Sequence, residues 1–335
     1  MEIPLLTYIV PVYNTEPYVL RCLRSILDQG LNAEQYEVLV VDDGSTDGSR
    51  AVVETMANDY PQVRLITQAN TGVSAARNLA LRNARGRYVQ FVDSDDYLEP
   101  GMMAALLERA ALEDLDILLF NYECVDGDGK PLPHVRGDNY AATAVIDGVA
   151  YLESHVMTPY VWRFLISRDY LDRGQWRFDE SLIVCEDGAL IAHLLLNARR
   201  MAQADAAVYR YVMRPGSAMH SGDSGHLRRR IMSQVDSAAL IDATIRDYEA
   251  SAGKSAPISV AGLRNVYLYF ALTKALMCGC VEPTIDRMRQ AGLYPFPCVG
   301  PEANYHGMKW KLIHWPMMHP RLWQLLSKVY RMIKK

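Results

Sequence analysis

The sequence predicts an α/β fold, in which a mixed, mainly parallel sheet is flanked by helices and followed by a C-terminal helical extension. Apolar runs of strand length alternate with helical patterns over roughly the first hundred residues. This alternation is typical of a parallel sheet covered by helices on both faces. Between about 226 and 292 the helical period dominates, which predicts the extension.

The expected elements can be placed in chain order. A strand over 5–11 is followed by Thr15 as a helix N-cap and by Pro17 in the first turn, and the helix that they start should end near Asp28. The other expected elements are strands over 36–41, 62–67, 87–92, 116–121 and 207–212, helices over 48–58 and 73–84, and a helix that starts at Glu99-Pro100.

Composition restricts the classes of function. Half of the 335 residues are hydrophobic, which is enough for a sizeable core in one large domain or in a domain with an appendage. The formal charge is −4, but no acidic residue follows Glu302, so 28 basic and 39 acidic side chains give residues 1–302 a charge of −11. This distribution argues against a nucleic-acid partner and directs any anionic partner to the tail.

Cysteine usage predicts a cytosolic protein, and hydropathy bears on membrane spans. The six cysteines form no CxxC pair and no zinc-ligand spacing, so we expect reduced thiols. The longest apolar stretch, about 266–281, contains Lys274 and is shorter than the ~20 residues of a spanning helix. We therefore expect no transmembrane helix.

Two acidic clusters, at 41–47 and 92–96, each follow an apolar run that predicts a buried strand. Open α/β sheets bind ligands at the carboxyl ends of their strands. Asp93 and Asp95 are two residues apart in an extended segment, so both carboxylates can face one site. A hard divalent cation is commonly held by one or two carboxylates together with phosphate oxygens. The alternative is that these acids cap the helix that follows, a role that fits Asp96 best.

Four segments then resemble a known family, the inverting nucleotide-sugar glycosyltransferases of family 2, which have the GT-A fold. The segments stand in the family's order, at 9–14 (IVPVYN), 41–47 (VDDGSTD), 70–78 (NTGVSAARN) and 86–96 (GRYVQFVDSDD). The resemblance implies a GT-A domain over 1–220, divided into a nucleotide-sugar half (1–100) and an acceptor half (101–220), before a helical extension (221–300) and a tail (301–335).

The resemblance also implies a donor site. Asp42 should meet the base or the ribose, and an ionised carboxylate is a suitable acceptor for a uracil ring N–H. Asp43 should tie down the loop. Arg77 should face the donor phosphate or the carboxylates of the pocket, with a solvated helix residue as the alternative. The implied nucleotide-sugar ligands are Pro11, Val12, Tyr13, Asn14, Asp42, Asn70, Arg77, Asp93, Ser94 and Arg214.

A metal site is implied at the same place. Asp95 and Asp93 should bind Mn²⁺ or Mg²⁺, which would neutralise the departing diphosphate. His220 is the third implied ligand, with an ordinary surface histidine as the alternative.

The catalytic base is implied farther along the chain. Inversion needs a carboxylate that takes the proton from the acceptor hydroxyl, and Glu186-Asp187 resembles the pair that carries this base in the family. We assign the base to Asp187 and an orienting role to Glu186. The alternative is that both acids complement a helix dipole. Trp162 and Arg163 should shape the acceptor side, although Trp162 is equally suited to the core.

The tail over 309–335 combines aromatic and aliphatic residues with seven cations and no acid. This pattern suits attachment to an anionic membrane surface, and packing onto the domain or in a dimer is the alternative. We expect a cytoplasmic protein, with peripheral attachment to the inner face of the plasma membrane if the tail binds lipid. The oligomeric state stays open.

The resemblance thus implies an enzyme that transfers a sugar from a nucleotide-diphosphate sugar, with a UDP-sugar favoured, to a glycan or lipid-linked acceptor in polysaccharide or cell-surface glycan synthesis. One alternative is a non-catalytic sugar- or membrane-binding relative, which would be expected to lose Asp95 or Asp187. Another is a sugar-phosphate nucleotidyltransferase, which would need a glycine-rich basic loop that residues 10–20 lack.

Overall fold

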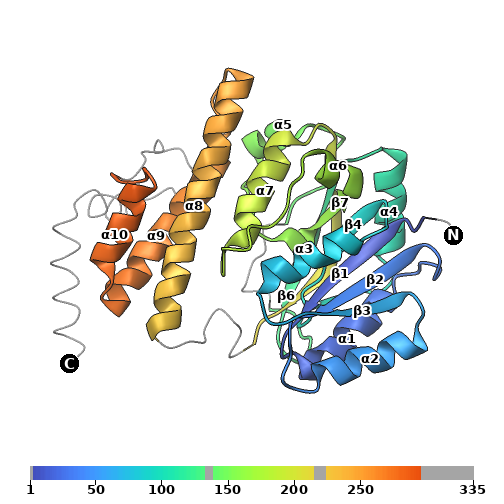
Figure 1. Ribbon diagram of the computed structural model, residues 1–335. Helices are drawn as coiled ribbons and strands as arrows, with labels where there is room; N and C mark the ends of the chain where they lie inside the picture. The colour runs from blue at the N-terminus through green and yellow to red at the C-terminus, as the bar shows by residue number, and fades with distance from the viewer. Residues whose placement is uncertain (1–2, 133–138, 215–223, 296–335) are drawn as a thin grey trace. The chain divides into compact units, whose positions relative to one another are not determined.

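The computed structural model describes residues 3–132, 139–214 and 224–295, and the chain forms two compact units (Figure 1). The first unit comprises Met1–Gly148, Tyr160–Glu180 and Ala198–His220, and the second comprises Val149–Pro159, Ser181–Asn197 and Ser221–Lys335. Among the described residues, no helix has both the length and the apolar character needed to cross a bilayer.

The first unit is built on one sheet with the strand order β3-β2-β1-β4-β7-β6-β8-β5. Its strands are β1 (Leu6–Val12), β2 (Tyr36–Asp42), β3 (Val63–Thr67), β4 (Tyr88–Phe91), β5 (Tyr97–Leu98), β6 (Ile117–Val125), β7 (Phe164–Ser167) and β8 (Met201–Val212). The neighbours from β3 to β4 are parallel, as are β6 and β8, whereas β7 is antiparallel to both β4 and β6, and β5 to β8. The predicted mixed, mainly parallel sheet is therefore confirmed.

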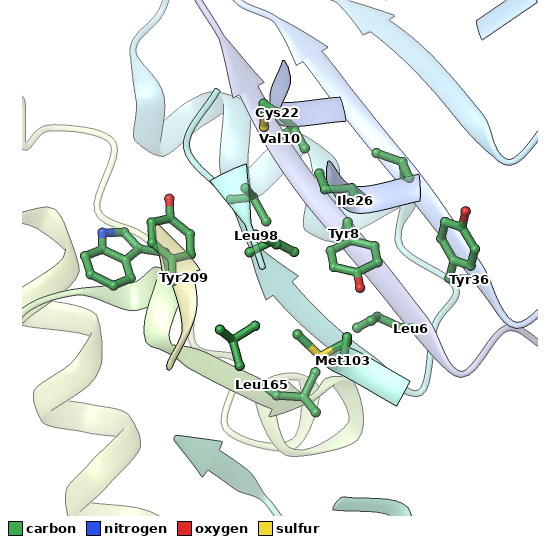
Figure 2. Close-up of a cluster of buried hydrophobic side chains, with 14 of the residues drawn as sticks. Leu6, Tyr8, Val10, Cys22, Ile26, Tyr36, Leu98, Met103, Leu165 and Tyr209 are labelled. Atoms are coloured by element: carbon green, nitrogen blue, oxygen red, sulfur yellow. The ribbon is translucent and has the colours of Figure 1, made fainter. Parts of the chain in front are cut away.

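Helices cover both faces of this sheet. They are α1 (Glu16–Leu27), α2 (Ser49–Asp59), α3 (Val73–Asn83), α4 (Met103–Leu112) and α6 (Arg168–Arg173), with a short 3₁₀ helix, η1 (Val161–Arg163). The apolar sides of α1, α2 and α4 belong to one core with the alternate residues of β1 that include Tyr8 and Val10, and α3 lies on the other face (Figure 1). Figure 2 shows this core, where Ile26 and Met103 lie near Tyr8. Burial on both faces explains why the central strands read as continuous apolar runs.

The second unit is helical. It contains α7 (Glu186–Asn197), α8 (Ser224–Ala252), α9 (Ile258–Cys278) and α10 (Val281–Gln290), and it takes in α5 (Gly148–Ser154) after its first residue. A short connection with Gly253 in the left-handed region joins α8 to α9, and Asp242 of α8 is paired with the buried Arg264 of α9. The predicted helical extension is present, whereas the domain limits at 220 and 300 stay a prediction.

One expected element is wrong. The helix expected to start at Glu99-Pro100 begins at Met103 instead. Residues 97–98 form β5 and pair with β8, and the Glu99 backbone N–H donates to the Val208 carbonyl (2.7 Å). The long-range pairing of β5 with β8 therefore delays the start of the helix beyond Pro100, the residue from which an earlier start was predicted.

Candidate active site

The carboxyl ends of β2, β1 and β4 bring the two acidic clusters to one edge of the sheet. Val12, the last residue of β1, lies opposite Asp42, the last residue of β2. On the other side of β1, the Val92 backbone N–H donates to the Ile9 carbonyl (2.9 Å) as β4 ends. Because β1 lies between β2 and β4, the loops that carry Asp42 and Asp93 flank the end of one strand.

The first acidic loop is held by its own side chains. Asp42 is buried, and one carboxylate oxygen accepts the Ser45 backbone N–H (3.1 Å). Asp43 accepts the backbone N–H groups of Thr71 and Gly72, both at 2.9 Å. The prediction that Asp43 ties down the loop is therefore confirmed.

Two further predicted nucleotide ligands lie at this loop. Asn14 is in the left-handed region (φ 52°), and its side-chain oxygen accepts the Thr46 N–H (2.8 Å). Gly44 (φ 74°) lies so close to Asn70 that a Cβ there would be 3.0 Å from the Asn70 nitrogen. The loop from Asn70 therefore borders the loop from Asp42, with Asn70 exposed. Tyr13 is also exposed, whereas Pro11 and Val12 are buried in β1.

The second acidic loop presents two carboxylates, each paired with an arginine. The Arg77 guanidinium donates to Asp93 (2.9 Å) and lies over the Phe178 ring. The Arg214 guanidinium donates to Asp95 (2.6 Å) and lies over the Tyr18 ring. Arg77 is buried and paired with Asp93, so the solvated alternative is wrong, whereas its role toward a donor stays a prediction.

The first half of α1 and its N-cap residue are hydrogen-bonded to this loop. Thr15 occupies the predicted N-cap position, but its hydroxyl makes no cap bond and donates to the buried Ser94 hydroxyl (3.0 Å). The Cys22 thiol donates to the Asp93 carbonyl (3.6 Å). Ser94 is thus a buried link between the loop and α1.

Asp96 does not cap a helix. It is buried and accepts the Tyr209 hydroxyl (2.8 Å) and the Val212 backbone N–H (2.7 Å). Burial, and then the charges of Asp95 and Asp93, raise the pKa of its carboxyl well above the usual range. The sequence could not show this role because both partners lie more than a hundred residues away.

Trp162 and Arg163 are buried in the first unit. Trp162 stacks on Tyr209, with ring centroids 4.2 Å apart, and the Arg163 side chain donates to the Phe120 carbonyl (3.1 Å). Trp162 is therefore a core residue. The aromatic stack that it forms was not predicted, although the alternating tyrosines at 209 and 211 on one strand are a signal for it.

The chemistry of Asp93 and Asp95 fits a hard divalent cation. Their side chains are 30% and 28% exposed, so both keep carboxylate surface for a ligand, and both are anionic oxygen donors. Within the described part of the chain, no group of three or more His, Cys, Asp or Glu could hold a metal. Water and a donor diphosphate would have to complete the coordination, as is common for Mg²⁺.

The two carboxylates predicted to supply and orient the catalytic base lie in the second unit. Glu186 and Asp187 are half-buried in the first turn of α7, as expected from their position before an apolar helical pattern. Burial, and then the charge of Glu186, raise the pKa of the neighbouring Cys185 thiol to about 12. Cys185 is therefore protonated at neutral pH and unsuited to act as a thiolate nucleophile.

Helix α8 anchors the turn before this pair. Ser233 accepts the backbone N–H groups of Ile183 (3.0 Å) and Val184 (3.2 Å), and Ser237 donates to the Cys185 carbonyl (2.7 Å). Cys185 itself has a φ of 65°, a conformation that non-glycine residues rarely adopt. The chain is thus held in a strained turn immediately before Glu186.

The other predicted features keep their status as predictions. His220 and the tail over 309–335 lie outside the described residues. The assignment of Asp187 as the base opposite Asp95 stays a prediction as well, because the two residues belong to different units.

Comparison with known proteins agrees with the sequence motifs. Residues 7–174 match the family described as glycosyl transferase family 2. The chain is 34% identical over 218 residues to the uncharacterized glycosyltransferase EpsJ of Bacillus subtilis, a match that covers 64% of this chain and 63% of EpsJ, less than two thirds of its length. It is 33% identical over 245 residues to the succinoglycan biosynthesis protein ExoO of Rhizobium meliloti, covering 68% and 69%.

A solved structure shares the fold. TarS 1–349 of S. aureus in complex with UDP-GlcNAc superposes with a TM-score of 0.60 over 98% of this chain and 91% of that chain, at 20% identity. At this identity the similarity shows the architecture alone, and that architecture is the predicted GT-A fold.

Proposed function

The chain belongs to glycosyl transferase family 2, and on this premise we propose that it transfers a sugar from a nucleotide-diphosphate sugar to a saccharide acceptor with inversion at the anomeric carbon. The observation that carries the proposal is that Asp42, Asp93 and Asp95 converge where the carboxyl ends of β2, β1 and β4 meet. Arg77 is paired with Asp93, and Arg214 is paired with Asp95. We favour a UDP-sugar as donor and a glycan or lipid-linked saccharide as acceptor, in polysaccharide or cell-surface glycan synthesis.

The first acidic loop would bind the nucleoside. Asp42 ends its strand beside the exposed segment that begins at Asn70, so a base could lie between them and offer its ring N–H to a carboxylate. Tyr13, exposed at the end of β1, would cover the base or the ribose. Asp93 would accept a ribose hydroxyl from the other side of β1.

The second acidic loop would hold the diphosphate. Asp95 and Asp93 would bind Mn²⁺ or Mg²⁺, and the bound ion would supply a Lewis acid for the leaving group. Arg77 and Arg214 would keep the two carboxylates oriented and add positive charge near the phosphates. Tyr209 would fix the loop from within, because its oxygen accepts the Asp93 N–H (3.1 Å) and its hydroxyl donates to Asp96.

Asp187 would complete the reaction. As the acceptor oxygen forms its bond to the anomeric carbon, its proton would pass to an Asp187 carboxylate oxygen, while the bond from the anomeric carbon to the diphosphate breaks and the nucleoside diphosphate leaves. Glu186 would orient the acceptor or the base. The turn fixed by Ser233 and Ser237 supports this role, because a base must be held in a defined position to act.

A nucleotide-sugar screen tests the proposal. Thermal unfolding of the full chain would be followed with UDP, UDP-glucose, UDP-galactose, UDP-N-acetylglucosamine and GDP-mannose, each with and without Mn²⁺. We expect a UDP-sugar to raise the melting temperature only when Mn²⁺ is present, by several degrees at a hundredfold excess over Kd. No stabilisation by any nucleotide sugar would contradict the proposal. Stabilisation without release of UDP in the presence of acceptor saccharides would indicate a non-catalytic sugar-binding relative.

A further inference from the structure

Two arginine–carboxylate pairs hold the second acidic loop, and they differ in how firmly the guanidinium is fixed. The Arg77 side chain, which is paired with Asp93, is 4% exposed and belongs to α3. The Arg214 side chain, which is paired with Asp95, is 20% exposed and lies two residues beyond the end of β8. Of the two, Arg214 is therefore the guanidinium that is better placed to exchange one partner for another.

The pair between Arg214 and Asp95 uses one carboxylate oxygen. Arg214 Nε and Nη2 both donate to Asp95 Oδ2, at 3.2 Å and 2.6 Å. A guanidinium fork binds most strongly when its donors reach two oxygens of one carboxylate or phosphate. A phosphate group would therefore offer Arg214 a better pair of acceptors than Asp95 does.

Tyr18 holds Arg214 at this carboxylate. The Arg214 guanidinium carbon lies 4.3 Å from the centroid of the Tyr18 ring, a cation–π contact that favours this position. Tyr18 is half-buried in the first turn of α1, and its backbone N–H donates to the Thr15 carbonyl (2.9 Å). Because the Thr15 hydroxyl is bonded to Ser94 of the acidic loop, the ring is fixed relative to Asp95.

A cation that binds Asp95 must compete with this guanidinium. Both are positive ions that gain from the same carboxylate, and they repel each other when they share it. A nucleoside diphosphate changes this balance in two ways, because its oxygens add ligands for the cation and also accept the Arg214 fork. Binding of the diphosphate and binding of the cation should then strengthen each other, since such a coupling is reciprocal.

We propose that Arg214 is an exchangeable counter-ion of Asp95, which weakens cation binding until a nucleoside diphosphate takes over the guanidinium. Tyr18 is the positioning residue that keeps Arg214 beside Asp95. This inference rests on the proposed function and names the regulation of its metal site, because the cation binds well only together with the donor.

Manganese binding by the full chain tests this exchange. Electron paramagnetic resonance would measure the Kd of Mn²⁺ at about 0.15 M salt, with and without UDP, and calorimetry would measure the Kd of UDP at saturating Mn²⁺. Without UDP, we expect Arg214→Ala to bind Mn²⁺ at least about fivefold more tightly than the wild type; its UDP affinity should fall about tenfold. A variant that only damaged the fold would lose both affinities, so the gain for Mn²⁺ is the decisive readout.

Three further variants separate the counter-ion from general effects of charge. Arg210→Ala is the matched control, because it removes the same charge four residues earlier on β8, where Arg210 is paired with Glu99 (2.8 Å). It should change the Mn²⁺ affinity less than about twofold. Tyr18→Leu should raise the Mn²⁺ affinity without UDP about two- to fivefold, because the guanidinium loses its aromatic partner, whereas Tyr18→Phe should keep the wild-type value.

The outcomes distinguish this inference from the proposed function. Unchanged or weaker Mn²⁺ binding by Arg214→Ala without UDP would overturn the exchange, and so would an equal gain in Arg210→Ala or an unchanged UDP affinity of Arg214→Ala. Wild-type Mn²⁺ affinity in Tyr18→Leu would overturn the role of Tyr18. Failure of the wild type to bind UDP or any UDP-sugar would instead overturn the proposed function, and the gain of Mn²⁺ affinity in Arg214→Ala would still be measurable in that case.

Discussion

At the scale of the single residue, Asp95 should decide turnover. The Asp95 carboxylate is paired with Arg214, and 28% of the Asp95 side chain is exposed. The carboxylate can therefore bind a metal ion in place of, or together with, the Arg214 guanidinium. We expect Asp95→Ala to lower metal-dependent kcat about a hundredfold or more, equivalent to about 3 kcal/mol of transition-state stabilisation. The measurement is UDP release at saturating Mn²⁺. Asp169→Ala removes an exposed ion pair on α6 and should leave the rate unchanged; near-normal turnover of Asp95→Ala would contradict the assignment.

Asp187 should separate transfer from donor binding. Replacement by asparagine keeps the size of the side chain but removes the proton acceptor, so Asp187→Asn should bind the donor with unchanged Kd and lose transfer by a factor of about 10² to 10⁴. Calorimetry with a UDP-sugar and a product assay would measure the two effects. If Asp187→Asn transferred sugar at a near-normal rate, the base would be another residue, and Glu186→Gln would be the next variant to assay.

At the scale of the element, the start of α7 depends on close packing against α9. A Cβ added to Gly188 would lie 2.2 Å from the Tyr267 hydroxyl oxygen and 2.9 Å from the ring carbon that bears it. We expect Gly188→Ala to reduce the free energy of unfolding by about 1–3 kcal/mol, and adding Tyr267→Phe should recover part of this loss. Gly262→Ala in α9 is the control, because its Cβ would meet nothing within 4 Å; it should be neutral or stabilising by about 1 kcal/mol. Thermal unfolding of the wild type and the three variants measures the effects, and equal stability of Gly188→Ala and Gly262→Ala would contradict the packing argument.

The elements that could be predicted are those determined by local signals. Thr15 and Pro17 predicted the start of α1, and the apolar runs predicted β1, β2 and β4 close to their observed limits. Asp96 was misinterpreted as a cap because an Asp before a proline-containing segment is a local helix signal, while the bonds that bury it come from β8. Helix α4 was placed too early for the same reason.

At the scale of the whole molecule, the motifs that form the candidate site could be predicted from the sequence, but the tertiary contacts that hold those motifs in place could not. Asp42, Asp93 and Arg77 stand in short motifs, and their meeting at one sheet edge follows from parallel strand order. The stack of Tyr160, Trp162 and Tyr209 joins segments almost fifty residues apart, and no local period encodes such a contact. The participation of Ser181–Asn197 in the helical unit likewise depends on tertiary packing.

The stability of the first unit at acid pH should depend on Glu37. This buried carboxylate lies near the amino end of β2, whereas the candidate site lies at the carboxyl end. It accepts the Thr7 hydroxyl of β1 (2.9 Å), the Arg85 backbone N–H (2.7 Å) and Arg64 of β3 (3.1 Å). Burial by itself raises the pKa of Glu37, but the hydrogen bonds from Arg85 and Thr7 outweigh it, so the pKa lies below the usual 4.5. Its contribution to stability is therefore complete above pH 4.5 and is lost as the pH falls through the lowered pKa.

Glu37→Gln should accordingly reduce the free energy of unfolding by about 2 kcal/mol at pH 7, because the bonds to a charged acceptor across three strands are weakened. The difference from the wild type should shrink as the pH is lowered below 4.5, where the wild-type carboxylate is protonated and loses the same advantage. Urea unfolding at pH 7, 5 and 3.5 measures it. Glu54→Gln breaks an exposed pair with Arg50 on α2 and should change stability by less than about 0.5 kcal/mol at every pH. A difference for Glu37→Gln that stayed constant or grew toward acid pH would show that Glu37 does not stabilise the sheet through its charge.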